Sequence, residues 1–312
     1  MLSVASGVER VRNMFLMGTY EDFPTASIIE SLELADDMYF NQQDTIMTDE
    51  QYDALKQYAY RMDPANAYFT GIGSAVRGGK IDLPFKMGSL NQVYLGDFVK
   101  WITKYSLEDH NLVITDKLDG ASTMLVYTES GDLQIAYSRG DGLQGADITR
   151  HARLIHNVPQ SIPNTTGASV VVRAENIIPP AKFSSVNTGK YARAGRIYKN
   201  PRNMVSGLMN SSENHVAVYK AIDTVAYEIV GSTLSKVDQL QQLARWGFST
   251  VHYSTAVGKL LNDEVLTDLL NKRRAVSEYE LDGVVIEVES STKRSAMYTD
   301  ELNPEYAVKF KV

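Results

Sequence analysis

The chain begins with two segments in which apolar residues recur at helical spacing. In the first segment, Ile28, Leu32, Ala35 and Tyr39 lie three or four residues apart, as on one face of an amphipathic helix. At its start, Ser27 and a glutamate three residues later form a capping-box pattern, which closes the first turn of a helix. We therefore expect this helix to begin at Ser27.

The second segment follows a short polar loop at residues 41–47. Thr48 and Gln51 form another capping-box pattern. The apolar positions that follow are Tyr52, Leu55, Ala59 and Met62. Asp63 precedes Pro64, and a residue before proline disfavours helix, so the helix should end there. The pattern predicts two antiparallel helices joined by a loop.

From about residue 83 onwards, short apolar stretches bounded by turn residues indicate β-strands. The expected strands cover residues 112–115, 123–128, 133–138, 170–175, 224–230, 284–288 and 306–311. Residues 129–132 (Glu-Ser-Gly-Asp) suit a hairpin turn. Helices lie between the strands, and the clearest of them spans residues 235–246 and stops at Gly247.

These patterns predict an α+β protein of two domains. A small helical domain covers residues 1–75, and a domain with a largely antiparallel sheet covers residues 76–312. The glycine-rich stretch at residues 71–80 is the expected connection.

The amino-acid composition excludes several kinds of catalytic and metal-binding site. The sequence has no cysteine, which excludes disulfides, a thiol nucleophile, iron–sulfur clusters and cysteine-ligated zinc in this chain. Its five histidines lack the spacing of a histidine metal site. Apolar runs are far shorter than the ~20 residues of a membrane span, and the first residues lack the apolar core of a secretory signal. We expect a soluble cytoplasmic protein without a membrane partner.

The formal net charge of −7 argues against a chain that grips nucleic acid alone, because lysine and arginine supply most of that affinity. The balance is reversed locally. Residues 182–212 contain six basic residues and no acid, with Tyr191 and Tyr198 between them. Such a segment suits a nucleic-acid backbone, although a solvated loop would have the same composition.

A series of short motifs carries the candidate chemistry. Taken alone, Lys117-Leu118-Asp119-Gly120 at the end of a strand would fit a surface turn. The further motifs, in chain order, are Ser138-Arg139-Gly140-Asp141-Gly142, Arg173-Ala174-Glu175, Asn200-Pro201-Arg202-Asn203, Tyr227, Asp282-Gly283-Val284-Val285-Ile286 and Lys309-Phe310-Lys311. Together they resemble the ordered motifs of covalent nucleotidyltransferases, and in detail those of the NAD-dependent DNA ligases.

The N-terminal segment supports the detailed resemblance. Tyr39, followed by Asp49, Tyr52 and Asp53, is similar to the family element that grips the nicotinamide mononucleotide half of NAD. On a helix, Asp49, Tyr52 and Asp53 share one face. Carboxylates and an aromatic ring suit a cationic nicotinamide and ribose hydroxyls, although an acidic solvated helix face would also explain them.

The resemblance implies an ATP-grasp-like covalent nucleotidyltransferase domain that adenylates itself from NAD with Mg²⁺, the first step of DNA nick sealing in replication and repair. It implies Lys117 as the nucleophile. It implies cofactor contacts at Tyr39, Asp49, Tyr52, Asp53, Ser89, Leu90, Asp119, Arg139, Glu175, Tyr227, Val285, Lys309 and Lys311. Arg196, Lys199 and Arg202 would contact nucleic acid, and the partner is nicked duplex DNA.

The nucleophile raises a physical requirement. A free lysine is mostly ammonium near neutral pH, and the neutral form costs roughly 4 kcal/mol at pH 7.5. An adenylation site must therefore favour the neutral amine, which nearby cations and Mg²⁺ do. Arg139 and Lys311 are the candidates to stabilise the developing phosphate charge.

The sequence departs from the family pattern at several positions. Thr115 stands where the family has glutamate, Glu287 where it has a phosphate-binding lysine, Asn210 where it has a second arginine, and Phe40 where histidine is common. Lys309, at a position that is usually uncharged, is a candidate to replace the missing cation. The departures suggest a divergent, viral branch.

Two alternatives stay open from the sequence. One is an ATP- or GTP-using RNA ligase or capping-type enzyme, and the other is a non-catalytic subunit that holds NAD or a partner. The family's OB-fold, zinc finger, helix-hairpin-helix and BRCT domains do not follow residue 312, so we expect either a fragment or a separate subunit that carries the OB-fold and helix-hairpin-helix parts.

Overall fold

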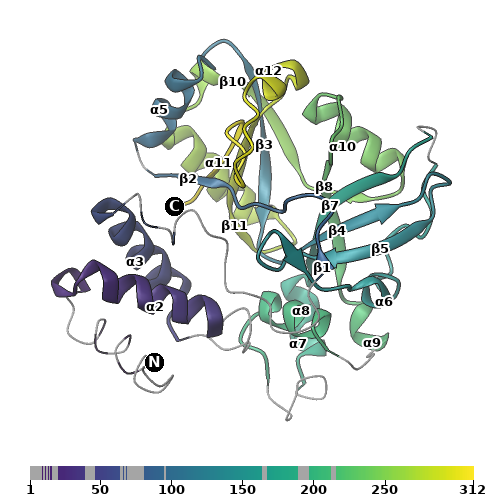
Figure 1. The fold of residues 1–312 in the computed structure, drawn as a ribbon, viewed down its shortest axis with the longest axis horizontal. Helices are drawn as coiled ribbons and strands as arrows, with labels where there is room; N and C mark the ends of the chain where they lie inside the picture. The colour runs from purple at the N-terminus through teal and green to yellow at the C-terminus, as the bar shows by residue number, and fades with distance from the viewer. Residues whose placement is uncertain are drawn as a thin grey trace. The chain divides into compact units, whose positions relative to one another are not determined.

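A computed structural model describes most of the chain, and the ranges below refer to that part. The described residues are 9, 11, 13, 15, 20–38, 46–63, 66, 68, 81–94, 96–163, 167–188, 197–211 and 216–312. They form two compact units (Figure 1). The first unit comprises Met1–Met87 with Gly140–Ala146, and the second comprises Gly88–Arg139 with Asp147–Val312. The expected domain boundary at residue 75 lies outside the described residues and stays a prediction.

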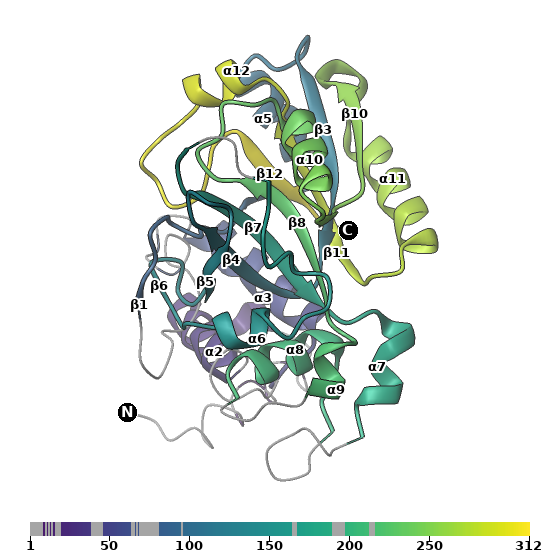
Figure 2. The ribbon, with the colours of Figure 1, turned by 90° about the vertical axis from the view of Figure 1, so that its right-hand side faces the viewer.

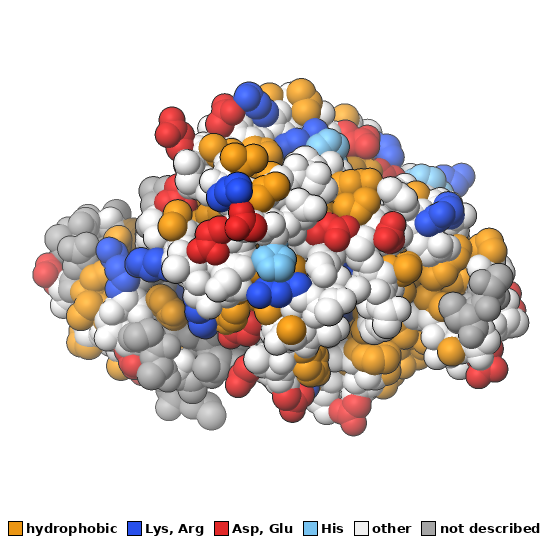
Figure 3. All heavy atoms as spheres, turned by 90° about the horizontal axis from the view of Figure 1, so that it is seen from above, with side chains coloured by type: hydrophobic (Ala, Val, Ile, Leu, Met, Phe, Trp, Pro, Cys, Tyr) orange, Lys and Arg blue, Asp and Glu red, His pale blue; other side chains and the backbone are white. Residues whose placement is uncertain are grey.

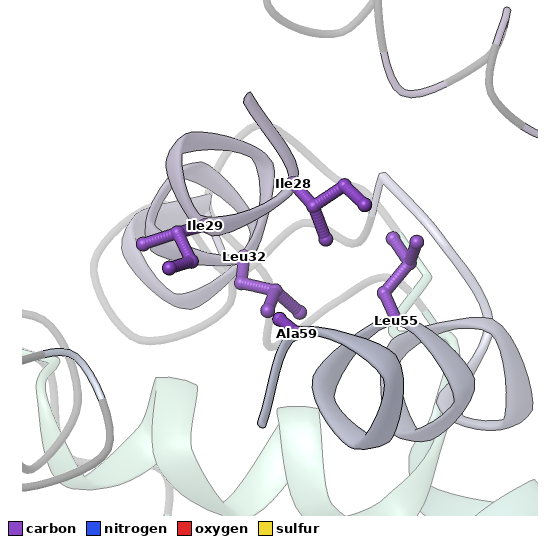
Figure 4. Close-up of a cluster of buried hydrophobic side chains, with 5 residues drawn as sticks. All are labelled: Ile28, Ile29, Leu32, Leu55 and Ala59. Atoms are coloured by element: carbon purple, nitrogen blue, oxygen red, sulfur yellow. The ribbon is translucent and has the colours of Figure 1, made fainter. Parts of the chain in front are cut away.

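The first unit contains the two expected helices. Its elements are the 3-10 helix η1 (Tyr20–Asp22), the helices α2 (Thr25–Asp37) and α3 (Asp49–Met62), and the strands β1 (Ile81–Asp82) and β6 (Gln144–Gly145). β1 and β6 pair antiparallel. The two helices pack through Ile28, Ile29 and Leu32 of α2 against Leu55 and Ala59 of α3 (Figure 4).

One of the two predicted helix starts is correct. Thr48 caps α3, since its side chain accepts a hydrogen bond from the Gln51 N–H, and the Gln51 side chain accepts one from the Thr48 N–H. The prediction that Ser27 starts α2 is wrong. The carbonyl of Pro24 already accepts the N–H of Ser27 at 2.9 Å, so the helix begins at Thr25 without a side-chain cap.

The second unit is built on two five-stranded sheets. The first, called here the β3 sheet, has the order β10 (Tyr253–Val257), β3 (Asn111–Leu118), β11 (Leu281–Val288), β12 (Ala307–Phe310), β2 (Asn91–Val93). The second, called the β7 sheet, has the order β5 (Leu133–Ser138), β4 (Ala121–Tyr127), β7 (Val170–Ile177), β8 (Asp223–Ile229), β9 (Ser249–Thr250). Only the β12–β2 and β8–β9 pairs among them are parallel, which confirms the largely antiparallel prediction.

Helices cover the sheets of the second unit. They are α5 (Asp97–Lys104), α6 (Thr149–Ala152), α7 (Pro180–Val186), α8 (Pro201–Met209), α9 (Val216–Tyr219), α10 (Lys236–Arg245), η4 (Gly258–Leu260), α11 (Asp263–Val276) and α12 (Ser291–Ala296). Figures 1 and 2 show α6, α7, α8 and α9 gathered at one end of the β7 sheet. α10 packs against β8, and α11 packs against β11. In the described part of the chain, no helix combines the length and apolar character that a membrane span requires.

Candidate active site

Strand register brings three of the predicted site residues, together with Thr115, to one face of the β3 sheet. Lys117 of β3 pairs with Gly283 of β11, and Thr115 pairs with Val285. Lys309 of β12 also pairs with Val285, from the other side of β11. Side chains directly opposite one another in a sheet share a face. Thr115, Lys117, Val285 and Lys309 therefore lie on the same face.

Asp282 lies between two lysines. Lys117 Nζ is 2.5 Å from its Oδ2, and Lys311 Nζ is 2.8 Å from its Oδ1. Burial alone would raise the pKa of the Asp282 carboxyl, but the two ammonium groups hold that pKa well below its usual range. Asp282 is therefore an anion that binds Lys117 and Lys311 at once.

A β-bulge explains how Asp282 reaches Lys117. The register between β3 and β11 shifts between Leu281 and Gly283, so Asp282 is the extra residue of the bulge. A Cβ atom on Gly283 would lie 2.3 Å from the Phe310 carbonyl oxygen. Only glycine at this position lets β11 approach β12 closely enough to bring Asp282 and Lys311 together.

Arg202 contributes a second ion pair two residues from Lys117. Its Nη1 is 2.6 Å from Asp119 Oδ1. Asn200 caps α8 through the Asn203 N–H, and Pro201 follows in the first turn, so Arg202 is held at the helix start. The structure thus places Arg202 with the predicted cofactor residue Asp119, while its nucleic-acid role stays a prediction.

Glu175 joins the same group from the β7 sheet. It pairs with Ser122 of β4, and the Ser122 hydroxyl donates to its Oε2 at 2.9 Å. Burial raises the pKa of Glu175, and Arg202, Lys117 and Arg139 oppose that shift. Three carboxylates and several cations therefore converge around the Lys117 amine, and such a site suits a phosphate-bearing ligand.

Tyr227 lies in β8, where the β7–β8 register shifts beside Arg173. Burial raises the pKa of its phenol, and the carboxylate of Glu175 adds to that shift. The ring is therefore neutral and close enough to the Glu175 carboxylate to interact with it. Ser89 and Leu90, both half-buried, directly precede β2, which pairs with β12.

Glu287 lies in a buried group of ion pairs and does not offer the positive charge that a phosphate contact requires. Its Oε2 is 2.7 Å from Lys236 Nζ of α10, and its Oε1 is 3.3 Å from Arg294 Nη1 of α12. The side chains of Lys236, Glu287 and Arg294 are only 5%, 10% and 8% exposed. The acid that reverses the family charge is thus one member of a buried ion triad. Sequence reasoning missed Lys236 and Arg294, because no local pattern links them to position 287.

Several predicted residues cannot be placed. Tyr39, Arg196 and the side chains of Asp49 and Asp53 lie outside the described residues. In the first unit, the Tyr52 hydroxyl is 2.8 Å from the Tyr68 hydroxyl, and Lys56 Nζ lies 5.1 Å from the Tyr52 ring centroid.

Lys199 is exposed before α8. Figure 3 is seen from above Figure 1, the end opposite the α8 label, and on that face the described basic side chains are interspersed with acidic ones. That face therefore does not present a continuous basic surface among the residues drawn by type.

Metal ligands are less evident than anion-binding groups. Within the described residues, no group of three or more histidine, cysteine, aspartate or glutamate side chains is arranged to hold a metal ion. Asp119, Glu175 and Asp282 each accept a hydrogen bond from a protein donor, Arg202, Ser122 and Lys117 respectively.

Comparison with known proteins gives a consistent result. The family described as "NAD-dependent DNA ligase adenylation domain" matches residues 79–312. A DNA ligase of Acanthamoeba polyphaga mimivirus is 32% identical over 288 residues, which cover 91% of this chain and 42% of that protein. A putative DNA ligase of Invertebrate iridescent virus 6 is 30% identical over 90% of this chain and 42% of its own length. A DNA ligase of Clostridioides difficile (strain 630) is 26% identical over 91% of this chain and 44% of its own length.

The chain thus spans less than half the length of these relatives. Among solved structures, an archaeal ATP-dependent RNA ligase matches with a TM-score of 0.44 and 12% identity, over 75% of this chain and 50% of that one.

Proposed function

Because the chain belongs to the family of NAD-dependent DNA ligase adenylation domains, we propose that Lys117 is the residue that takes the adenylyl group from NAD. The observation that carries this proposal is the position of the Lys117 amine, 2.5 Å from Asp282 and within a group of cations that also contains Lys311. The Asp282 carboxylate orients the amine and favours its ammonium form, while the neighbouring cations favour the neutral amine and would stabilise the phosphate that it attacks.

The proposed step is a nucleophilic substitution at the adenylyl phosphorus. Lys117 first loses one ammonium proton to solvent, because Asp282, with its lowered pKa, accepts a hydrogen bond from the amine without taking its proton. The Nζ lone pair attacks the adenylyl phosphorus, and an N–P bond forms. The pyrophosphate P–O bond breaks, and its electron pair leaves on nicotinamide mononucleotide. The second amine proton passes to solvent, which leaves a lysyl-AMP phosphoramide.

The other site residues receive roles that suit their chemistry. Arg139, Lys309 and Lys311 would neutralise the pyrophosphate, Tyr227 and Val285 would contact the adenine, and Glu175 and Asp119 would bind ribose hydroxyls or cations. Ser89 and Leu90 would lie beside the nucleotide. In the first unit, Tyr39, Asp49, Tyr52 and Asp53 would bind the nicotinamide mononucleotide half.

The donor set around Lys117 also fits Mg²⁺, which prefers carboxylate and phosphate oxygens. Glu175 and Asp282 are the residues that would hold it together with the phosphates of NAD. When bound, it would supply additional positive charge to the pyrophosphate. The ATP-grasp-like description of the fold belongs to the same proposal.

The activity of the whole protein extends the proposal. The complete reaction of the whole protein would seal nicked duplex DNA during replication or repair. We propose that it takes place in the cytoplasm. The parts of the relatives that this chain does not span, or a separate subunit that carries them, would supply most of the grip on DNA. Arg196, Lys199 and Arg202 would add local contacts to the phosphate backbone.

Intact-mass spectrometry tests the proposal directly. After incubation with NAD and Mg²⁺, the chain should gain the mass of one adenylyl group, and Lys117→Ala should gain none. Lys293→Ala, a lysine of α12 outside this site, is the matched control and should still gain it. A mass gain with ATP but not NAD would favour the ATP-using alternative, and no gain with either nucleotide would favour a non-catalytic subunit.

A further inference from the structure

The residue directly before Lys117 makes a bidentate ion pair on the back of the β3 sheet. Asp116 Oδ1 accepts from Arg273 Nε at 3.0 Å, and Asp116 Oδ2 accepts from Arg273 Nη2 at 2.8 Å. The Asp116 side chain is 5% exposed and that of Arg273 is 20% exposed. Two parallel hydrogen bonds between rigid planar groups fix both distance and orientation, which a single contact does not.

The pair lies on the face opposite the site. Successive side chains of a strand point to opposite faces, so Asp116 points away from the face that carries Lys117. Arg273 belongs to the last turn of α11, and Figures 1 and 2 show this helix alongside the β3 sheet. α11 therefore supports the strand from behind, at the residue next to the amine.

Two further hydrogen bonds contact β3 and β11 near the same point. The Asp116 N–H donates to the His252 carbonyl at 3.1 Å, just beyond the end of the β10–β3 pairing at Tyr253 and Thr115. The following residue of α11, Arg274, donates Nε to the Leu281 carbonyl at 3.4 Å, directly before Asp282. The C-terminal turn of α11 thus contacts both strands at the residues that precede Lys117 and Asp282.

We propose that Arg273 is a positioning residue for adenylyl transfer: its pair with Asp116 fixes the end of β3 and thereby holds the Lys117 amine against Asp282. The proposal rests on the proposed role of Lys117 as the nucleophile. Arg273 does not touch the reacting atoms, and it acts through the strand. A displacement of about 1 Å at a reacting atom costs roughly a hundredfold in rate, so a support of this kind has a measurable effect.

The test compares Arg273→Gln, Asp116→Asn and Arg273→Lys with wild type in the full chain. A matched control is Lys272→Gln, which breaks an exposed pair with Asp268 (2.6 Å) within the same helix. Single-turnover formation of the adenylyl adduct is measured against NAD concentration by intact mass. Thermal unfolding and circular dichroism identify variants that fail to fold.

We expect Arg273→Gln and Asp116→Asn to lower the rate at saturating NAD by roughly ten- to a hundredfold. The NAD concentration for half-maximal rate should change by less than about twofold, since the variants leave the nucleotide contacts in place. The rate of Arg273→Lys should lie between the rates of these variants and that of wild type, because an ammonium keeps the positive charge but cannot make the two parallel hydrogen bonds of a guanidinium. Lys272→Gln should match wild type.

The pH dependence of the rate separates positioning from general stability. Arg273→Gln leaves an unpaired carboxylate next to Lys117, which favours the ammonium and moves the pH–rate curve to higher pH. Asp116→Asn leaves an unpaired guanidinium and moves the curve to lower pH. The other charged groups that face Lys117, namely Asp282, Lys311, Glu175, Arg202, Asp119 and Arg139, are the same in both variants.

Two results would overturn the proposal. One is a wild-type rate at saturating NAD in both folded variants, and the other is a rate loss without opposite pH shifts that follows the unfolded fraction alone. Failure of the proposed function is a separate outcome, since it would appear as no adduct on the wild-type chain, or as an adduct that survives in Lys117→Ala.

Discussion

At position 287, an acid occupies the face of the β3 sheet on which Lys117 lies, and its partners explain why the chain tolerates it. Lys236 and Arg294 neutralise Glu287 from two different helices. Burial alone would raise the pKa of Glu228 of β8, but Arg173, Lys236 and Arg294 lower it. The two cations of the triad therefore also interact with a carboxylate of β8. The charge at position 287 thus serves the packing of α10 and α12 on the sheets.

If Glu287 supports packing and Lys309 contacts the nucleotide, substitutions at the two positions should affect different properties: stability at position 287 and adduct formation at position 309. Glu287→Gln should destabilise the fold by roughly 3–5 kcal/mol, because it leaves two buried cations without their anion. The folded variant should still form the adenylyl adduct. Lys309→Ala should keep its stability and lose about a hundredfold in adduct formation, if the amine contacts the pyrophosphate. Chemical denaturation and intact mass measure the two effects.

Near-normal adduct formation by Lys309→Ala would remove Lys309 from the site. Full stability of Glu287→Gln would contradict a supporting role for the triad.

Single residues also show how much of the candidate site can be predicted from the sequence. Lys117, Asp119, Glu175 and Lys311 are predictable as site residues because each stands in a short motif. Asp282 stands in such a motif too, but its sequence does not assign it a role, and the structure shows it between Lys117 and Lys311. No such motif marks Ser122, the partner of Glu175, or Arg273, the partner of Asp116. The same is true of Lys236 and Arg294, the partners of Glu287. The pairs made by Ser122, Lys236 and Arg273 join residues more than 50 apart in the chain, and Arg294 pairs with Glu287 from α12, seven residues away, so these contacts arise only in the folded protein.

At the scale of elements, a buried histidine supports α8. His151 Nδ1 of α6 is 2.5 Å from the Tyr219 hydroxyl of α9, and that hydroxyl donates to the Leu208 carbonyl of α8 at 3.3 Å. Arg150 Nε donates to His151 Nε2 at 3.2 Å, so Nδ1 carries the proton. This chain of hydrogen bonds holds the helix that presents Arg202.

The chain of hydrogen bonds makes stability depend on pH. Burial lowers the pKa of His151 to about 4, below the usual value near 6.5. The unfolded chain therefore binds the proton first as pH falls. Stability from this group is complete above about pH 6.5 and declines towards pH 4, by roughly 3 kcal/mol in total.

Denaturation of wild type and His151→Asn at a series of pH values measures this effect. Asparagine retains a donor near the Nδ1 position and does not titrate, so its curve should be flatter between pH 6.5 and 4. Parallel curves would contradict the assignment.

Elements with a strong periodic pattern were predicted well, and short ones were not. The range 133–138 agrees with β5, and the helix at 235–246 agrees with α10, which Ser235 caps. β3 extends to Leu118, three residues beyond the prediction, because Asp116 and Lys117 still pair with β11. The two- and three-residue strands β1, β2, β6 and β9 exist only through their partners, so local sequence carries little signal for them.

At the scale of the whole molecule, the net charge of −7 opposes binding to a polyanion. We expect this chain alone to bind a nicked duplex with a Kd of about 10 µM or weaker at ~0.15 M salt, and more weakly as salt rises. Fluorescence anisotropy of a labelled nicked duplex over a salt series measures this. The same duplex without a nick is the control, and nanomolar binding would contradict the expectation.

The order of strands in the β3 sheet has a consequence for biosynthesis. β12, at residues 307–310, is inserted between β11 and β2, and β2 is formed by residues 91–93. While the ribosome is still making the chain, the β7 sheet can assemble from residues 121–250, but β2 must wait more than 200 residues for its neighbour. The lysine–aspartate–lysine contact at Asp282 is consequently among the last parts of the second unit to form, so a truncated nascent chain holds a folded β7 sheet without the proposed adenylation site.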